Sequence, residues 1–448
     1  MPRTVIVLKF GGTSVRDAHW MRRVIDIAYD ALDRGPLLVS SAMTGATDDL
    51  LAMAGAAARG NGEEALQLLE NVRRRHLEVC RDITDSDAGP AHDVLEQMLA
   101  EVRYLIQGIT LVRECTPRTQ DAVVSFGERL ATVLLTAETE RRGIPVQLLD
   151  SRQLVRTDDH FTNAACIVEA TYDLIRANVH PHPGTLLIAQ GFIGATAEGV
   201  TSTLGRGGSD FSASLFGSAL GAEEVQIWTD VDGILSADPR IVADAVLLDT
   251  ISYSEAAELA FFGAKVVHPF TIQPAIELGI PVTVRNTGKP EGTGTRIHAA
   301  VDVHGVRALA AKKGVTVISV HSSRMLNAYG FLSRIFGVFE RFRISVDLIA
   351  TSEVSVSMTV DTSVNLAPAL AELEQFGHVQ VESDQAILSL VGKNLWKDPT
   401  FVTRVFAALA KTPVRMISLG ASDVNLSLVV GQQDVNSAMQ TLHKEFFA

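Results

Sequence analysis

The chain has 448 residues, of which 47% are hydrophobic and 20% charged, and its formal net charge is −13 at pH 7. At roughly 150 residues per domain this length predicts several domains, and the acidic balance argues against general binding to nucleic acid, whose phosphates need a basic surface. No stretch approaches the roughly 20 apolar residues of a membrane span, so we expect a cytoplasmic protein that contacts no membrane. The three cysteines match no metal-binding spacing, and we predict no protein-held metal site.

Up to residue 297 the sequence alternates short apolar runs with longer amphipathic stretches. We predict strands at Val5–Phe10, Pro36–Ser41, Val146–Leu149, Thr185–Gln190, Glu224–Thr229 and Ile280–Arg285. Between them, Leu50–Cys80 and Ala91–Val112 have the apolar spacing of helices. This alternation predicts an α/β domain with a mainly parallel sheet sandwiched by helices. Ligands of such folds bind beyond the carboxyl ends of the strands.

A lysine, two glycines and two hydroxyl residues close the first predicted strand, in the sequence Lys9–Ser14 (KFGGTS). Glycines at this place let backbone N–H groups approach an anion, and a following helix N-terminus adds a favourable dipole. Lys9 would supply a positive charge for a phosphoryl group. The alternative is a tight strand-to-helix turn in which Ser or Thr caps the helix.

A second glycine-rich loop, Thr203–Ser214 (TLGRGGSDFSAS), leads into a stretch of small residues. Its Arg206 suits a carboxylate or a phosphate, because a guanidinium group binds such anions through two hydrogen bonds. Asp210 in the same loop has three interpretations: it pairs with a catalytic lysine, orients a substrate ammonium, or caps the next helix. The capping role explains neither Arg206 nor the density of glycines.

Further charged residues stand near predicted strand and helix ends. Ile227–Arg240 (IWTDVDGILSADPR) places Thr229 and Asp230 at a strand end, where such groups suit contacts to a nucleotide or to metal-bound phosphate. Glu128, in SFGERL, is either a substrate ligand or a charge that compensates a helix dipole. Lys265, in FFGAKVVHP, is either a second lysine beside a nucleotide or a surface lysine.

The last third of the chain is an internal duplication. Three segments recur 70 residues further on, which pairs position 317 with 387, 334 with 404 and 344 with 414. One shared offset predicts a tandem repeat of a strand–helix–strand–strand unit, in the form of two ferredoxin-like βαββαβ domains. The glycine- and proline-rich stretch Arg285–Ile297 marks a boundary. We therefore predict domains at residues 1–297, 298–385 and 386–448.

Taken together, these motifs resemble a known family. KFGGTSV, SFGERL, TLGRGGSD, WTDVDGILSADPR and GAKVVHP occur in the order and approximate spacing of the aspartate kinases, which are amino acid kinases that end in tandem ACT domains. The segment from Arg324 to Thr362 most resembles the lysine-sensitive monofunctional type. The resemblance implies transfer of the γ-phosphoryl group of ATP, with Mg²⁺, to the side-chain carboxylate of L-aspartate. The product would be 4-phospho-L-aspartate, at the first step of lysine, threonine and methionine biosynthesis.

The resemblance also implies roles for the residues that match the family motifs. Those predicted to hold the phosphates of ATP are Lys9, Gly11, Gly12 and Thr13. The residues predicted to line the aspartate pocket are Ser41, Thr47, Glu128 and Arg206, with Glu128 on the ammonium and Arg206 on the α-carboxylate. Further ATP contacts are predicted at Thr229, Asp230, Leu235, Arg240, Lys265 and Val266, and Leu235 stands where many relatives have tyrosine. The predicted catalytic residues are Lys9, Asp210 and Lys265.

The resemblance to lysine-sensitive relatives implies an L-lysine site in the first copy of the duplication. The residues predicted to form it are Met325, Ala328, Phe331, Leu332, Ser345, Val346, Asp347, Ser352 and Glu353. Asp347 and Glu353 suit the ε-ammonium, and the alternative is that both are exposed loop charges. Because Ile417 replaces Asp347 in the second copy, we predict that the first copy alone binds the effector. The second copy would complete a dimer interface, in a homodimer or homotetramer joined through the ACT domains.

Other functions remain as alternatives. A sister amino acid kinase, acting on N-acetylglutamate, glutamate or a nucleoside monophosphate, would share the phosphate motifs, but the duplication and GERL argue against it. A catalytically inactive amino-acid sensor would have no need for the charged residues of these motifs. The effector stays open among lysine, threonine, both or neither, with lysine favoured.

Overall fold

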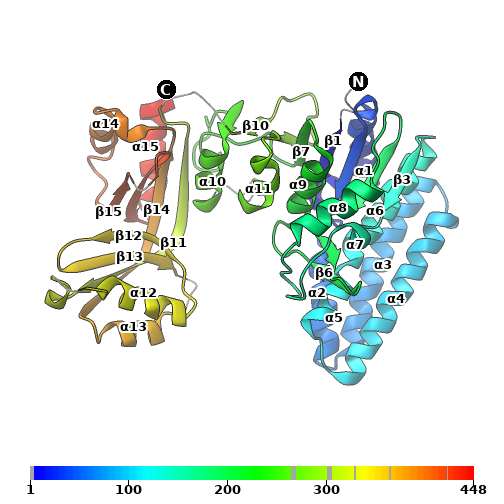
Figure 1. Ribbon diagram of the computed structural model, residues 1–448, viewed down its shortest axis with the longest axis horizontal. Coiled ribbons are helices and arrows are strands. Elements are labelled where there is room, and N and C mark those ends of the chain that lie inside the picture. The colour runs from blue at the N-terminus through cyan, green and yellow to red at the C-terminus, as the bar shows by residue number, and fades with distance from the viewer. Residues whose placement is uncertain are drawn as a thin grey trace. The chain divides into compact units, whose positions relative to one another are not determined.

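The computed structural model describes residues 5–263, 269–299, 305–326, 329–362, 365–420 and 422–447. Contacts divide them into two units (Figure 1). The first contains the described residues of 1–234, 249–253 and 266–300, and the second those of 235–248, 254–265 and 301–448. The predicted boundary at residue 297 therefore lies close to the end of the first unit, but two segments before it pack with the second.

An eight-stranded sheet forms the centre of the first unit, with the order β3-β4-β2-β1-β7-β9-β10-β8. Its strands are β1 (Ile6–Phe10), β2 (Pro36–Ser40), β3 (Val146–Leu149), β4 (Leu186–Gln190), β7 (Glu224–Thr229), β8 (Thr250–Ser252), β9 (Val282–Asn286) and β10 (Thr295–His298). The six predicted strands are present and run parallel, while β10 runs antiparallel to β9. A small hairpin, β5 (Ile193–Ala195) with β6 (Thr201–Thr203), lies beyond β4 in the chain.

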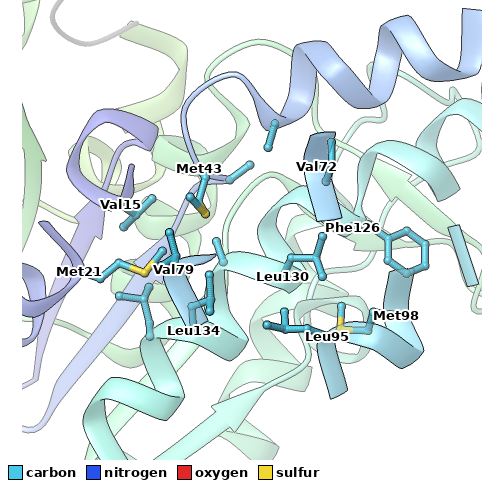
Figure 2. Packing of buried hydrophobic residues seen from close by; sticks show 14 of the residues in the cluster. Val15, Met21, Met43, Val72, Val79, Leu95, Met98, Phe126, Leu130 and Leu134 are labelled. Atoms are coloured by element: carbon cyan, nitrogen blue, oxygen red, sulfur yellow. The ribbon is translucent and has the colours of Figure 1, made fainter. Parts of the chain in front are cut away.

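Helices pack against this sheet and against one another. In the first unit they are α1 (Ala18–Tyr29), α2 (Ala46–Ala58), α3 (Gly62–Thr84), α4 (Pro90–Val112), α5 (Pro117–Val124), α6 (Phe126–Arg141), α7 (Ser151–Leu154), α8 (Val168–Asn178), α9 (Gly208–Leu220) and α11 (Pro269–Glu277). The next helix after α9, α10 (Tyr253–Phe261), belongs to the second unit from Ser254 on. Figure 2 shows part of the core, where Met21, Val79 and Leu134 from α1, α3 and α6 lie together. Among the described helices, none is both long and apolar enough to cross a membrane.

The stretch Leu50–Cys80, predicted to be helical, contains parts of two helices, α2 and α3. Gly60, between α2 and α3, has a φ of +79°, a left-handed conformation that ends a helix. The side chain of Asn61 then accepts a hydrogen bond from the N–H of Glu64 and so begins α3. The apolar spacing continues across the break, which is why the pattern alone did not reveal it.

The second unit is built on a six-stranded antiparallel sheet with the order β12-β13-β11-β14-β16-β15. Its strands are β11 (Ala308–His321), β12 (Val346–Thr351), β13 (Ser355–Asp361), β14 (His378–Val391), β15 (Val414–Leu419) and β16 (Asn425–Gly431). Its helices, apart from α10, are α12 (Phe331–Arg341), α13 (Ala367–Leu373), α14 (Phe401–Ala408) and α15 (Val435–Phe447). Two buried clusters, one around α12 and α13 and one around α14 and α15, give the two copies separate cores.

The two copies of the duplication share their longest strands. β11 and β14 have 14 residues each and pair with one another on both sides of an irregularity near Gly314. The second part of β11 pairs with β13 and the first part of β14, whereas the first part of β11 extends the sheet of β14, β16 and β15. Each ferredoxin-like half therefore takes its fourth strand from the other copy. A boundary between residues 385 and 386 falls inside β14, so no linker separates the halves.

Candidate active site

A cavity of about 520 Å³ opens at the carboxyl ends of the parallel strands of the first unit. It is lined by segments that are far apart in the sequence: the end of β1, the loop from β2 to α2, the helices α5 and α6, and the loop before α9. Seven of the predicted site residues line this one cavity: Lys9, Gly12, Ser41, Thr47, Glu128, Arg206 and Asp210. The fold thus brings together the phosphate motif and the residues predicted to bind the substrate.

Lys9 is a nearly buried cation on β1, between β2 and β7. Its Nζ atom lies 2.6 Å from Oδ1 of Asp210, in the first turn of α9. Gly205 and Gly207, just before α9, have φ values of +72° and +75°, which L side chains rarely adopt. These turns place the helix, and with it Asp210, against the end of β1. Of the three interpretations of Asp210, pairing with a lysine is the one that this geometry favours.

The turn after β1 is packed too closely for a larger residue. A Cβ atom on Gly12 would lie 2.9 Å from the carbonyl oxygen of Ala42. The N–H of Gly11 donates a hydrogen bond to the carbonyl of Trp228 on β7, so Gly11 joins the two strands and does not line the cavity. Thr13 lies outside the cavity lining as well.

Glu128 is a buried carboxyl group in the first turn of α6. Its Oε1 atom accepts a hydrogen bond of 3.2 Å from the N–H of Ala42, whereas its Oε2 atom has no hydrogen-bond partner among the described residues. Burial raises the pKa of Glu128 to about 8, although the hydrogen bond from Ala42 and the charge of Lys9 oppose the shift. A buried carboxylate with one unpaired oxygen is suited to a ligand cation.

Asp121 is a cavity residue that the sequence analysis missed. This carboxyl group of α5 is buried, and its Oδ2 atom accepts hydrogen bonds of 2.9 Å from the N–H groups of Thr162 and Thr203. Its Oδ1 atom accepts the hydroxyl of Thr203 at 2.7 Å. Burial raises its pKa despite these bonds. The only signal in the sequence is an acidic residue beside the apolar run Ala122–Val124.

Asp121 fixes the start of the loop that carries Arg206. Thr203 ends β6, and Arg206 follows three residues later on a loop that lines the cavity. Arg206 is exposed, and among the described residues its guanidinium has no ion-pair or hydrogen-bond partner. A cation that is free at one edge of a cavity is available for an anionic ligand.

The predicted ATP contacts are only partly described. Thr229 is the last residue of β7 and Asp230 follows it. Because β7 pairs with β1, both lie next to the turn at Gly11, but outside the cavity lining. Leu235 and Arg240 belong to the second unit, where Arg240 forms an ion pair of 2.7 Å with Asp238. Lys265 and Val266 lie outside the described residues.

The described residues do not fit a metal site held by the protein. No group of three or more His, Cys, Asp or Glu side chains comes together in this part of the chain, and Asp210, the acidic residue next to Lys9, is engaged by that lysine. Mg²⁺ often reaches kinases on the phosphates of its nucleotide and keeps several waters. We therefore treat Mg²⁺ below as part of the substrate MgATP.

The predicted effector residues lie at two ends of β12. Met325 in a short 3₁₀ turn, Phe331 and Leu332 at the start of α12, and Ser352 and Glu353 after β12 form one group. The N–H of Ser322 donates a hydrogen bond to the carbonyl of Val354, which joins the segment before the 3₁₀ turn to the loop after β12. Ser345, Val346 and Asp347 stand at the other end of β12, and six residues of strand correspond to roughly 20 Å. Ala328 lies outside the described residues.

Comparison with known proteins gives one consistent family. Residues 4–286 match the model of the amino acid kinase family, and residues 388–446 match a model of the ACT domain. The lysine-sensitive aspartokinase 3 of Escherichia coli is 38% identical over 99% of both chains. The chloroplastic aspartokinase 1 of Arabidopsis thaliana is 37% identical over 98% of this chain and 80% of its own length.

Solved structures agree with these relatives. The structure of E. coli aspartokinase III in complex with aspartate and ADP covers 99% of this chain, with a TM-score of 0.85 and 37% identity. The same enzyme in complex with lysine and aspartate gives a TM-score of 0.82 and 36% identity. At 99% coverage, the likeness spans both the parallel sheet and the duplicated antiparallel sheet. On this evidence the chain belongs to the amino acid kinase family, as an aspartokinase with a C-terminal ACT region.

Proposed function

We propose that this chain transfers the γ-phosphoryl group of MgATP to the side-chain carboxylate of L-aspartate and that L-lysine inhibits it. The observation that carries the first part is the charge pattern of the cavity in the first unit. Lys9 with Asp210, the buried Glu128 and the exposed Arg206 line one space, which offers positive charge for a phosphoryl group and partners for both α-groups of an amino acid. The E. coli relative was solved with aspartate and ADP, which supports the same two ligands here.

L-Aspartate would be held by its α-amino and α-carboxyl groups. The unpaired Oε2 atom of Glu128 is the partner for the ammonium, since a cation offsets the cost of a buried charge. The exposed guanidinium of Arg206 binds the α-carboxylate, and Asp121 keeps the Arg206 loop in place through Thr203. With both α-groups held, the side-chain carboxylate is the group left to face the nucleotide.

The transfer itself needs charge neutralisation more than proton transfer. The attacking carboxylate is already ionised near neutral pH, so no general base is required. Two anions must instead be held in line, with the charge of the transferring group compensated. Lys9 supplies that positive charge, and Asp210 holds the ammonium group of Lys9 at the end of β1. Mg²⁺, carried by ATP, would add charge on the phosphates.

Inhibition by L-lysine would require two copies of the chain. β12 is an edge strand that pairs only with β13 among the described strands, and Ile349 in its middle is 46% exposed. Antiparallel pairing of two such edges around a two-fold axis would bring opposite ends of β12 together. The two groups of effector residues, separated by roughly 20 Å in one chain, would then share a site across the homodimer. A relative solved with lysine supports this effector.

Acceptor analogues test the reaction. The acyl phosphate formed from MgATP is trapped with hydroxylamine, using L-aspartate, L-asparagine, N-acetyl-L-aspartate and L-glutamate in parallel. We expect product from L-aspartate, none from L-asparagine, whose side chain lacks the carboxylate, and a greatly raised KM for N-acetyl-L-aspartate, which lacks the ammonium. A preference for L-glutamate or for N-acetylated acceptors would assign the chain to a different acceptor and overturn the role of Glu128.

A further inference from the structure

The carboxylate predicted to receive the effector is already occupied by a residue of the chain. Nζ of Lys312, on β11, lies 2.6 Å from Oδ2 of Asp347, at the start of β12. The side chain of Asp347 is 4% exposed and that of Lys312 is 22% exposed, so this ion pair is largely shielded from water. β12 belongs to one ferredoxin-like half, and the part of β11 that carries Lys312 extends the sheet of the other half. Among the described residues, this ion pair therefore connects the two halves.

The second copy carries a counterpart with the charges reversed. The 70-residue offset relates Lys312 to Glu382, and Glu382 pairs with Arg415 on β15, the strand equivalent to β12. In that pair, Arg415 is 36% and Glu382 39% exposed, so the contact is open to solvent and contributes little. Ile417 stands where Asp347 would be. In each copy an ion pair thus joins an edge strand, β12 or β15, to a long strand, β11 or β14. Only the pair of the first copy contains a buried carboxylate.

We propose that Lys312 is an internal ammonium that occupies the effector position at Asp347 and must be displaced when L-lysine binds. This inference rests on the proposed inhibition by L-lysine. Lys312 would act as a specificity-determining residue, because it sets how tightly an incoming ammonium is bound. A neutral amino acid cannot replace it, since displacement would leave Asp347 buried without a cation.

The arrangement also gives the displaced lysine a place to go. Nζ of Lys312 lies 5.5 Å from the centre of the ring of Phe261, at the end of α10. A cation over an aromatic face is stabilised without a carboxylate, so Lys312 can leave Asp347 and stay on this ring. Phe261 precedes Lys265 by four residues in the sequence. The effector would therefore act on the helix that leads to the predicted nucleotide segment.

The competition predicts a gain of affinity when the internal ammonium is removed. The apparent affinity of a ligand is its intrinsic affinity multiplied by the fraction of the protein in which its site is free. An ammonium of the chain that occupies the site lowers this fraction. Lys312→Met keeps the apolar stem on Phe261 and removes the charge. We expect L-lysine to bind the full-length variant about three- to tenfold more tightly than the native chain, measured by titration calorimetry. Lys312→Gln, whose amide can still donate to Asp347, should give an intermediate affinity.

Two controls show whether the gain is specific. Lys313→Met removes the adjacent, exposed lysine and should leave the affinity for L-lysine unchanged. L-Norleucine, which has the same chain without the ε-ammonium, should bind the native chain and Lys312→Met equally weakly. A gain for both ligands would indicate a loosened pocket and would overturn the proposal.

The outcomes separate this inference from the regulation on which it rests. If the native chain binds L-lysine and Asp347→Asn loses that binding, while Lys312→Met leaves the affinity unchanged or weaker, the role of Lys312 is wrong and the effector site stands. If neither the native chain nor Lys312→Met binds L-lysine, the proposed regulation fails and the inference fails with it.

Discussion

The cavity of the first unit and the effector residues of the second differ in what one chain can complete. Lys9, Glu128, Arg206 and Asp210 come from three segments of the sequence and line one space within a single chain. The effector residues divide between two ends of β12 and do not meet. Under the proposed function, catalysis would therefore be a property of one copy, whereas inhibition by L-lysine would be a property of a pair. The predictions below alter one region at a time.

The largest effect is expected from Lys9→Met. Removing the charge proposed to face the transferring phosphoryl group should lower kcat by about 1000-fold, because a donor that would stabilise the transition state is lost. Steady-state rates of acyl-phosphate formation measure this loss, with the exposed Lys411→Met as the matched control. A fall of less than tenfold in kcat would show that Lys9 has only the structural role of a strand-end lysine.

Glu128→Gln should act on substrate binding more than on the rate of transfer. Without the carboxylate, the KM for L-aspartate should rise about 100-fold, since an ammonium then faces a neutral amide. Burial keeps the pKa of Glu128 at about 8 in the free protein. The native KM should therefore rise by about tenfold for each pH unit below 8, where the carboxyl group is protonated. The KM of Glu128→Gln should not change over this range.

The same raised pKa has an opposite consequence for stability. A carboxyl group whose pKa is higher in the folded state favours folding while it is protonated, and this contribution is lost as the pH rises toward about 8. Glu128→Gln should therefore unfold at a temperature no lower than the native chain at pH 8.5, measured by calorimetry. A clear loss of stability at that pH would mean that Glu128 is a structural residue and not a binding residue.

A smaller effect is expected at Asp121, which does not touch the substrate in this account. Asp121→Ala should lower kcat/KM for L-aspartate by about 10- to 30-fold, because two N–H groups and one hydroxyl lose their acceptor and the Arg206 loop loosens. Asp121→Asn keeps an acceptor for the N–H groups and should recover most of this activity. If both variants raise the KM for MgATP and leave that for L-aspartate unchanged, Asp121 does not position the Arg206 loop.

The smallest effect is a partial recovery of L-lysine binding when two variants of the effector residues are mixed. Asp347→Asn and Glu353→Gln should each abolish inhibition by L-lysine without affecting the rate in its absence. When equal amounts of the two variants are unfolded and refolded together, half of the dimers contain one chain of each variant. In such a dimer, one of the two shared sites has both native carboxylates and the other has neither. About a quarter of the sites should then bind L-lysine, measured by calorimetry. No recovery would show that both carboxylates act within one chain.

Much of the first unit could be predicted because its signals are local. The six parallel strands are short apolar runs with polar or glycine-rich ends, and Lys9, Arg206 and Glu128 stand beside those ends. Asp121 was missed because its partners, Thr162 and Thr203, are distant in the sequence and polar only through their backbone and hydroxyl groups. The residues near Asp121 in the sequence therefore do not predict its contacts with Thr162 and Thr203.

The second unit shows a different limit. A repeat is visible in the sequence, but an exchange of strands between its copies is not, because the apolar residues of β11 do not show which partner strand each part of it takes. A cut at residue 385 is natural for a tandem repeat and falls inside β14. The pairing of Lys312 with Asp347 was hidden for the same reason, since it depends on which half receives the shared strand.

We propose that this aspartokinase phosphorylates L-aspartate and is inhibited by L-lysine. The most direct test is the formation of aspartyl hydroxamate from MgATP, L-aspartate and hydroxylamine at pH 8, with and without L-lysine, for the native chain and for Lys9→Met. We predict product from the native chain, less product when L-lysine is present, and none above background from Lys9→Met. Product that is indifferent to L-lysine would contradict the regulatory part, and equal product from Lys9→Met would contradict the catalytic part.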